Sequence, residues 1–155
     1  GRRLQFQADE ERRFHPQYDG YPIGEVIKQA DVVLLGYPWM YPMDAEWRAN
    51  DLRIYENVTR ETGLAMTWSM HAIGWIELGF EDEAEANFER GFGPYAREPF
   101  KVWTEQSDPQ LVGATNFVTG MGGFLQSILN GYLGIRVRLE ELDLRPRLLP
   151  NTTGV

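Results

Sequence analysis

One carboxylate in this sequence stands in an aromatic setting that could support chemistry. Glu105 follows Phe100, Val102 and Trp103, and an acidic, proline-containing loop comes directly after it. An indole face offers a stacking surface for a sugar, and it also excludes water from a nearby carboxyl group, which raises the carboxyl pKa. The alternative is a surface glutamate that ends a half-buried strand or loop. The local pattern makes Glu105 a candidate for a sugar site without deciding between these two roles.

A glycine cluster follows in the run Gly120-Met121-Gly122-Gly123. The run has neither the G-x-G-x-x-G spacing after a strand nor the Lys and Ser/Thr of a P-loop, so it does not predict a nucleotide site. Small residues in an apolar helix allow a neighbouring backbone to approach closely. We therefore expect these glycines to serve close helix packing.

Polar residues interrupt two apolar segments. Ser69 and His71 are two positions apart and do not share a helix face, so a Ser–His nucleophilic pair is not expected. His71 is expected to be a hydrogen-bonded core histidine, with a pocket-facing role as the alternative. Lys28 and Gln29 break an apolar face, and a buried lysine would need Asp31 or a ligand hydroxyl as its partner. The alternative is that this polar side is simply solvated.

Composition narrows the classes of partner. The 155 residues suit one domain with a real core. The formal net charge of −8 argues against a nucleic-acid groove or an anionic membrane surface, because both need clustered Lys and Arg. The absence of Cys excludes disulfides and thiol nucleophiles, and two His leave little for a His-based metal site. No apolar run approaches the length of a membrane span. We expect no metal, no nucleic acid and no membrane among the partners.

Helical periodicity begins after an irregular start. Residues 1–22 show no clean period and predict a loop. Apolar residues at helical spacing predict a helix over 24–36, although its β-branched residues leave a strand as the alternative. Asp44 is expected to cap a second helix that ends at Gly63.

Three further helices and two strands are expected. Residues 65–78 are apolar almost all the way round, which is typical of a helix packed on several sides. Residues 81–95 have one wet face and predict an outer helix, whereas 113–132 are again mostly apolar and rich in glycine. Inner and outer helices therefore alternate. Over 135–149 the apolar residues alternate with polar ones, which predicts two short strands.

Two N-x-T sequons, at Asn57 and Asn151, predict N-glycosylation sites. Together with the start at Gly1 instead of Met, they favour a processed product in a secreted or lumenal compartment. A cytoplasmic location is the alternative.

Four segments, taken in order, resemble glycoside hydrolase family 65, and in particular its acid-trehalase-like branch. They are VIKQADVVLLGYP (26–38), GLAMTWSMHAIGWIEL (63–78), PFKVWTE (99–105) and NFVTGMGGFLQSILNGYLGIRV (116–137). The resemblance implies a mainly α chain that forms the C-terminal part of an (α/α)6 barrel, followed by the first strands of a C-terminal β-sheet. Such a barrel needs more helices than this chain supplies, so the N-terminal remainder of the same enzyme is an expected partner.

The resemblance also suggests how the chain is divided. An extended segment covers 1–23, the helical part of the catalytic barrel covers 24–134, and the start of the C-terminal β region covers 135–155.

Individual residues acquire roles from the resemblance. Glu105, in the KVWTE motif, would be the general base of an inverting glycosidase, with the general acid on the N-terminal part. Lys28 and Gln29, in the IKQAD motif, match positions that bind hydroxyls of the terminal glucose, and we add Trp103 as a wall of that subsite. The implied activity is hydrolysis of a carbohydrate, a glucosyl disaccharide, with glucosylgalactosyl-hydroxylysine as the leading substrate and no cofactor.

Disaccharide phosphorylases of the same family are the close alternative. Their phosphate site draws on segments that correspond to TWSMH and TGMGG, which makes His71, Gly122 and Gly123 a candidate anion or sugar subsite. The acid of the KVWTE motif and the apolar residues of TWSMH favour the hydrolase. A third interpretation is a non-catalytic storage or sugar-binding remnant of the fold, because the expected acid lies outside these residues.

Overall fold

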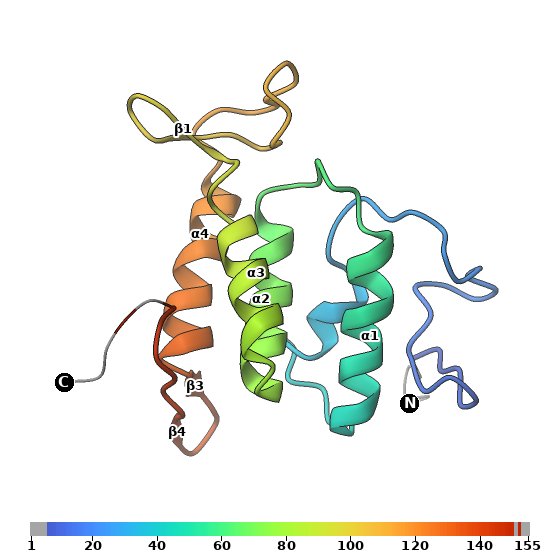
Figure 1. The fold of residues 1–155 in the computed structure, drawn as a ribbon. Coiled ribbons are helices and arrows are strands. Elements are labelled where there is room, and N and C mark those ends of the chain that lie inside the picture. Colours follow the sequence, from blue (N-terminus) through green and yellow to red (C-terminus); the bar gives the residue numbers. More distant parts are fainter. Residues whose placement is uncertain (1–5, 151, 153–155) are drawn as a thin grey trace.

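The described chain consists of helices joined by irregular segments and two short hairpins (Figure 1). The computed structural model describes residues 6–150 and residue 152. The helices are α1 (Ala45–Val58), α2 (Met66–Leu78), α3 (Glu81–Arg90) and α4 (Val118–Gln126), with a 3-10 turn η1 (Val32–Leu35) before them and a π-helix η2 (Ser127–Tyr132) that continues α4.

Helix α2 is the inner element, with α1, α3 and α4 packed around it (Figure 1). Every α2 residue from Thr67 to Ile76 is buried, as its apolar sequence predicts. Gly74 lets α1 approach closely, since a Cβ at this position would lie 2.8 Å from a methyl carbon of Leu52. Among the described residues, none of the helices is both long and apolar enough to cross a membrane.

The two hairpins lie at opposite ends of the helices (Figure 1). Strand β1 (Ala96–Arg97) pairs antiparallel with β2 (Val102–Trp103), at the end where α2 and α4 begin. Strand β3 (Ile135–Val137) pairs antiparallel with β4 (Leu142–Leu144), near the end where α2 finishes. The alternating pattern after residue 134 thus correctly predicts a short pair of strands, and the chain is mainly α-helical with a few short strands.

The helix predicted over residues 24–36 is wrong. The backbone of Ile27 instead pairs with the chain that leaves α1: its N–H donates to the Val58 carbonyl at 3.0 Å, and its carbonyl accepts from the Arg60 N–H at 3.1 Å. A residue bonded in this way to a distant segment cannot also supply the i to i−4 bonds of a helix. Only the short turn η1 is helical in this stretch.

Two other helices are shorter than predicted. The helix expected over 81–95 ends at Arg90, and the one expected over 113–132 begins at Val118. Asp44 does precede α1 with an extended backbone, but its side chain makes no capping hydrogen bond, and α1 ends at Val58, ahead of Gly63. Residues 91–95 and 113–117, which the sequence pattern placed in α3 and α4, lie instead in the segments before and after Glu105.

We predict that Gly74→Ala destabilises the protein by about 1–3 kcal/mol, the typical cost of overpacking a tight core. Chemical denaturation measures this cost. Adding Leu52→Ala should give a double variant that is more stable than the sum of the two single effects, because the shorter side chain makes room for the new methyl group. Strictly additive effects would contradict the contact.

Candidate functional site

Glu105 is held by backbone pairing on two sides, at the end of the molecule where α2 and α4 begin. Its N–H donates to the Ala114 carbonyl at 2.9 Å, and its carbonyl accepts from the Ala65 N–H at 3.0 Å. Ala65 immediately precedes α2, so Glu105 is tied directly to the start of the inner helix. The rest of its loop is anchored to the same elements, since the Trp103 carbonyl accepts from the Phe117 N–H just before α4.

The Glu105 carboxylate is oriented by Gly113 and Ala114, on the opposite side of the same loop. Its Oε2 accepts a hydrogen bond from the Ala114 N–H at 3.0 Å. Gly113, next to Ala114, has φ +64° and leaves no room for a side chain, because a Cβ there would lie 2.7 Å from Oε2. The left-handed backbone and the close approach both require glycine. The carboxylate therefore has a defined direction and is half-buried.

Arg97 fixes the loop that carries Glu105, and no local pattern in the sequence points to it. Its Nη2 donates to three successive carbonyls, those of Gln106 at 3.1 Å, Ser107 at 2.7 Å and Asp108 at 3.1 Å. Its Nε donates to the Thr104 hydroxyl at 3.2 Å. A guanidinium carries several donors in a fixed plane, so one side chain can satisfy a whole turn of carbonyls. Arg97 is a positioning residue for Glu105.

Trp103 lies beside Glu105 and reaches across to α4. Its ring is 5.7 Å from that of Phe124 between centroids, and a Cβ on Gly120 would lie 3.4 Å from its Cε3. The indole is half-buried, so part of it packs in the core and part remains accessible. Gly120 also faces Ala65, the residue bonded to the Glu105 carbonyl. The structure thus brings Trp103, Glu105 and the start of α4 together.

Lys28 and Gln29 lie next to the residues that lead into α2. The Lys28 carbonyl would be 3.2 Å from a Cβ on Gly63, two residues before Ala65. Lys28 is exposed and Gln29 half-buried, which agrees with the solvated alternative and not with a buried lysine. The Asp31 carboxylate accepts instead from the Gln17 side chain at 2.8 Å. Both sequence-predicted sugar ligands therefore lie near the start of α2, and so does Glu105.

The three residues of the candidate anion subsite are not gathered on one surface. Gly123 packs against α2, where a Cβ on Gly123 would lie 3.3 Å from the Met66 Cα, and this matches the close packing predicted for the glycines. Gly122 has no neighbour within 4 Å of its Cβ position. His71 is completely buried, with its ring 5.7 Å from that of Trp68. The buried His71 and the partly exposed Gly122 therefore do not share a surface of the described residues.

His71 is a core histidine, but the expected hydrogen bond is not found. Neither ring nitrogen has a hydrogen-bond partner among the described residues, and the Thr67 hydroxyl one turn earlier also has none. Burial, and then the positive charge of Arg90, lowers the pKa of His71 to about 3. The imidazole is therefore neutral in the fold at physiological pH.

One of the two sequons, at Asn57, lies within the described residues. Asn57 is exposed near the end of α1, whereas Thr59 of the same sequon is buried and its hydroxyl donates to the Tyr55 carbonyl. Asn151 lies outside the described residues. Within those residues no group of three or more acidic or histidine side chains is arranged to hold a metal ion.

Comparison with known proteins gives consistent relatives. No family model matches the chain. Protein-glucosylgalactosylhydroxylysine glucosidase from Danio rerio is 49% identical over 148 residues, which cover 96% of this chain and 22% of that protein. Acid trehalase from Emericella nidulans is 35% identical over 133 residues, covering 80% of this chain and 13% of that protein. The chain thus spans about a fifth of the length of the glucosidases it matches.

A solved structure also resembles the fold. A putative kojibiose phosphorylase from the human microbiome superimposes with a TM-score of 0.66, covering 93% of this chain and 24% of that one. The sequence identity is 18%, so this likeness concerns the fold alone.

We predict that His71 makes the stability of the protein sensitive to acid. Because its folded pKa lies below the unfolded value, stability is complete above about pH 6.5 and falls by about 1.4 kcal/mol per pH unit as the pH drops towards 3. The stability difference between His71→Leu and the wild type should therefore grow steadily in acid, as measured by denaturation at several pH values. Thr67→Val is the matched control, since it also removes an unpaired buried group but cannot titrate. A pH-independent difference for His71→Leu would contradict the prediction.

Proposed function

We propose that this chain, which belongs to glycoside hydrolase family 65 in its acid-trehalase-like branch, supplies the water-activating base of an inverting α-glucosidase. The observation that carries this proposal is the fixed Glu105 carboxylate, aimed by Ala114 and Gly113 and tied to the start of α2. A group that must take a proton in a short-lived transition state has to be held in place beforehand.

The chemistry follows from the inverting mechanism. Glu105 takes a proton from a water molecule, whose oxygen attacks the anomeric carbon of the terminal glucose from the face opposite the leaving group. A carboxylic acid on another part of the enzyme donates a proton to the glycosidic oxygen as that bond breaks. Inverting glycosidases separate the two carboxyl groups by about 6.5–9.5 Å to leave room for the water. The products are glucose with inverted configuration and the freed acceptor.

We propose Lys28, Gln29 and Trp103 as the glucose subsite. The exposed Lys28 ammonium can donate to sugar hydroxyls, and the Gln29 amide can both donate and accept. The accessible part of the Trp103 indole offers an apolar face against which the C–H groups of a sugar ring can lie. All three lie on segments that meet at the start of α2.

The leading substrate is glucosylgalactosyl-hydroxylysine. The relatives that share about half of their residues with this chain, in fish, bird, mouse and slime mould, carry the name protein-glucosylgalactosylhydroxylysine glucosidase. The acid trehalases share a smaller fraction of residues over less of the chain. The identity gradient therefore supports the hydroxylysine-linked disaccharide over trehalose.

We further propose that these helices are the C-terminal part of an (α/α)6 barrel completed by the rest of the enzyme. Helix α4 and its continuation η2 expose an apolar stripe, with Val118 74%, Leu125 56% and Leu129 46% exposed. A stripe at this spacing is normally covered by another helix. The similarity in fold to a longer chain, of which this one covers 24%, supports the same arrangement.

Two other functions make different predictions. A disaccharide phosphorylase would use phosphate in place of water and release glucose 1-phosphate, and a named phosphorylase does share the fold. A sugar-binding remnant would bind the disaccharide without cleaving it. The defined direction of the Glu105 carboxylate favours hydrolysis over both, because neither phosphate attack nor simple binding needs a base at this position.

We predict that Glu105→Gln in the full enzyme lowers kcat by about 10²–10⁴-fold while the affinity for the disaccharide changes little, as for a lost general base. Glucose release and equilibrium binding measure the two quantities. Glu98→Gln is the matched control, since Glu98 is an exposed carboxylate in the turn between β1 and β2 and pairs only with the exposed Lys101 among the described residues. Near-normal turnover in Glu105→Gln would remove Glu105 from the mechanism, and glucose 1-phosphate as product would replace hydrolysis with phosphorolysis.

We predict that Gly113→Ala also lowers kcat, because the new methyl group would displace the Glu105 carboxylate. Gly20→Ala is the control: Gly20 has a similar left-handed φ of +78°, but its Cβ position has no neighbour within 4 Å. Both variants carry the same backbone strain, about 1 kcal/mol. Only Gly113→Ala should lose activity in a turnover assay, and equal activity in the two variants would show that Gly113 does not position the base.

A further inference from the structure

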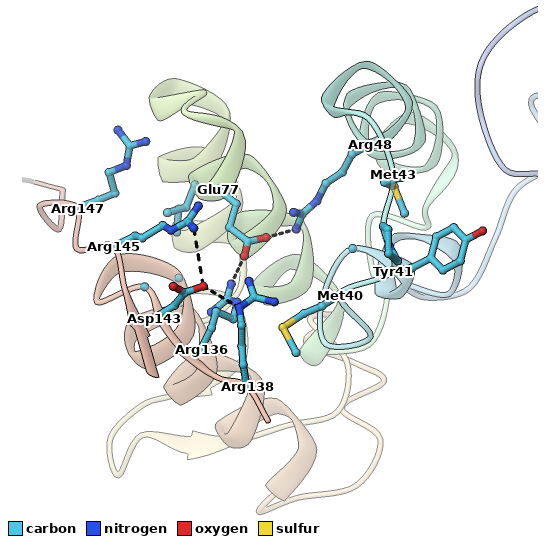
Figure 2. Close-up of a pocket in the computed structure, with 15 residues that line it drawn as sticks. Met40, Tyr41, Met43, Arg48, Glu77, Arg136, Arg138, Asp143, Arg145 and Arg147 are labelled. Atoms are coloured by element: carbon cyan, nitrogen blue, oxygen red, sulfur yellow. Dashed lines mark hydrogen bonds and ion pairs between the residues drawn. The ribbon is translucent and has the colours of Figure 1, made fainter. Parts of the chain in front are cut away.

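A second candidate site lies at the opposite end of the helices from Glu105. It is a cavity of about 360 Å³ between the end of α2, the start of α1 and the β3–β4 hairpin (Figure 2). Five arginines line it, and only two carboxylates do. The arginines are Arg48, Arg136, Arg138, Arg145 and Arg147, and the carboxylates are Glu77 and Asp143. This balance is the reverse of the whole chain, which carries 15 basic and 23 acidic residues.

Each carboxylate is already shared between two guanidinium groups. Glu77 accepts from Arg48 with one oxygen and from Arg136 with the other. In the same cavity, the Asp143 carboxylate is 2.7 Å from the Arg138 Nε and 3.7 Å from the Arg145 Nη2. Figure 2 shows these four guanidiniums converging on the two acids.

A third carboxylate, that of Glu141, lies 3.8 Å from the Arg138 Nε at the rim, so the five arginines of the lining face three acids and two positive charges remain uncompensated. Arginine does not lose its proton in proteins, so this excess cannot be relieved by titration. Like charges held close together at a protein surface repel one another, because water screens them only in part. A bound anion would remove this repulsion.

Arg136 is packed into the cavity wall, unlike an arginine on an open surface. Its side chain is buried, with 6% of the residue exposed, and its guanidinium lies 4.7 Å from the centre of the Tyr37 ring. Its Nη1 donates to the backbone carbonyls of Asn130 and Ile135. These contacts fix the plane of the group before any ligand arrives, and its buried Nε has no hydrogen-bond partner among the described residues.

The opposite wall of the cavity is less polar. It is formed by Met40, Tyr41 and Met43; Figure 2 shows the Met40 side chain towards the arginines, whereas the Tyr41 ring points away from them. Met40 and Tyr41 are 38% and 40% exposed, so this wall is accessible. The cavity therefore combines a cationic end with an apolar side, which suits an anionic group carried on a larger molecule.

We propose that this cavity binds a doubly charged oxyanion, the phosphate or sulfate group of a small molecule. The two excess charges match a dianion, and planar guanidiniums bind tetrahedral oxyanions through paired N–H donors. The site lies at the other end of α2 from Glu105, so the proposal is independent of the glucosidase activity.

Isothermal titration of the full enzyme with sodium sulfate, at constant ionic strength set by sodium chloride, tests the proposal. Sulfate can also occupy a catalytic phosphate site, so binding is assigned to this cavity by substitutions at Arg138 and Arg145, which line it. We expect saturable binding that the double variant Arg138→Gln/Arg145→Gln weakens by at least about tenfold, the loss expected from one or more charged hydrogen bonds. Both arginines are exposed, so the variant should still fold.

Arg12→Gln is the matched control, because Arg12 is an exposed arginine that pairs with Asp9 and does not line the cavity. It should leave sulfate affinity unchanged. Phenyl phosphate and inorganic phosphate distinguish the source of the anion. Tighter binding of the ester indicates a ligand that also contacts Met40, and equal binding indicates the free ion. No saturable binding of any of these anions, or sulfate affinity retained in the double variant, overturns the proposal.

Discussion

The apolar surface of α2 runs all the way around the helix, and this one constraint organises the rest of the described chain. A helix without a wet face must be covered on every side, because exposing it would cost the free energy of hydrating its whole apolar surface. Helices α1, α3 and α4 each take one side, and glycines such as Gly74 and Gly120 set how closely the neighbouring segments approach. Both candidate sites lie at the ends of α2, where the covering elements leave it.

At the start of α2 the chain is positioned mostly by backbone hydrogen bonds. The Glu105 loop is tied through main-chain groups to Ala65 and Ala114, and Arg97 binds three of its carbonyls. Backbone groups hold a loop more rigidly than long side chains do, because they have no rotamer freedom to lose. A short irregular loop can therefore carry a carboxylate in a defined direction.

At the C-terminal end of α2 the chain is held by ion pairs. Glu77 and Asp143 join arginines from α1 and from the β3–β4 region, so electrostatics links segments that are far apart in sequence. Ion pairs with a fixed partner geometry give specificity of arrangement even where their net stabilisation is small. The excess of guanidinium groups over carboxylates is what distinguishes this end from an ordinary network of ion pairs.

The sequence alone determined the elements whose signal is local. Residues 65–78 predict an inner helix because they are apolar on almost every face, and residues 135–149 predict two short strands by alternation. The local pattern around Glu105 left its role open, and its assignment as a base comes from the resemblance carried by the KVWTE motif and stays a prediction. Only the tertiary structure decided that residues 24–36 are not a helix, because Ile27 bonds to the segment that follows α1. It also decided the role of Gly113 and Arg97 beside Glu105, and the gathering of Arg48 with Arg136 around Glu77. A periodic pattern reports which face of an element is buried, whereas contacts between distant segments depend on how the chain packs, and no local pattern encodes them.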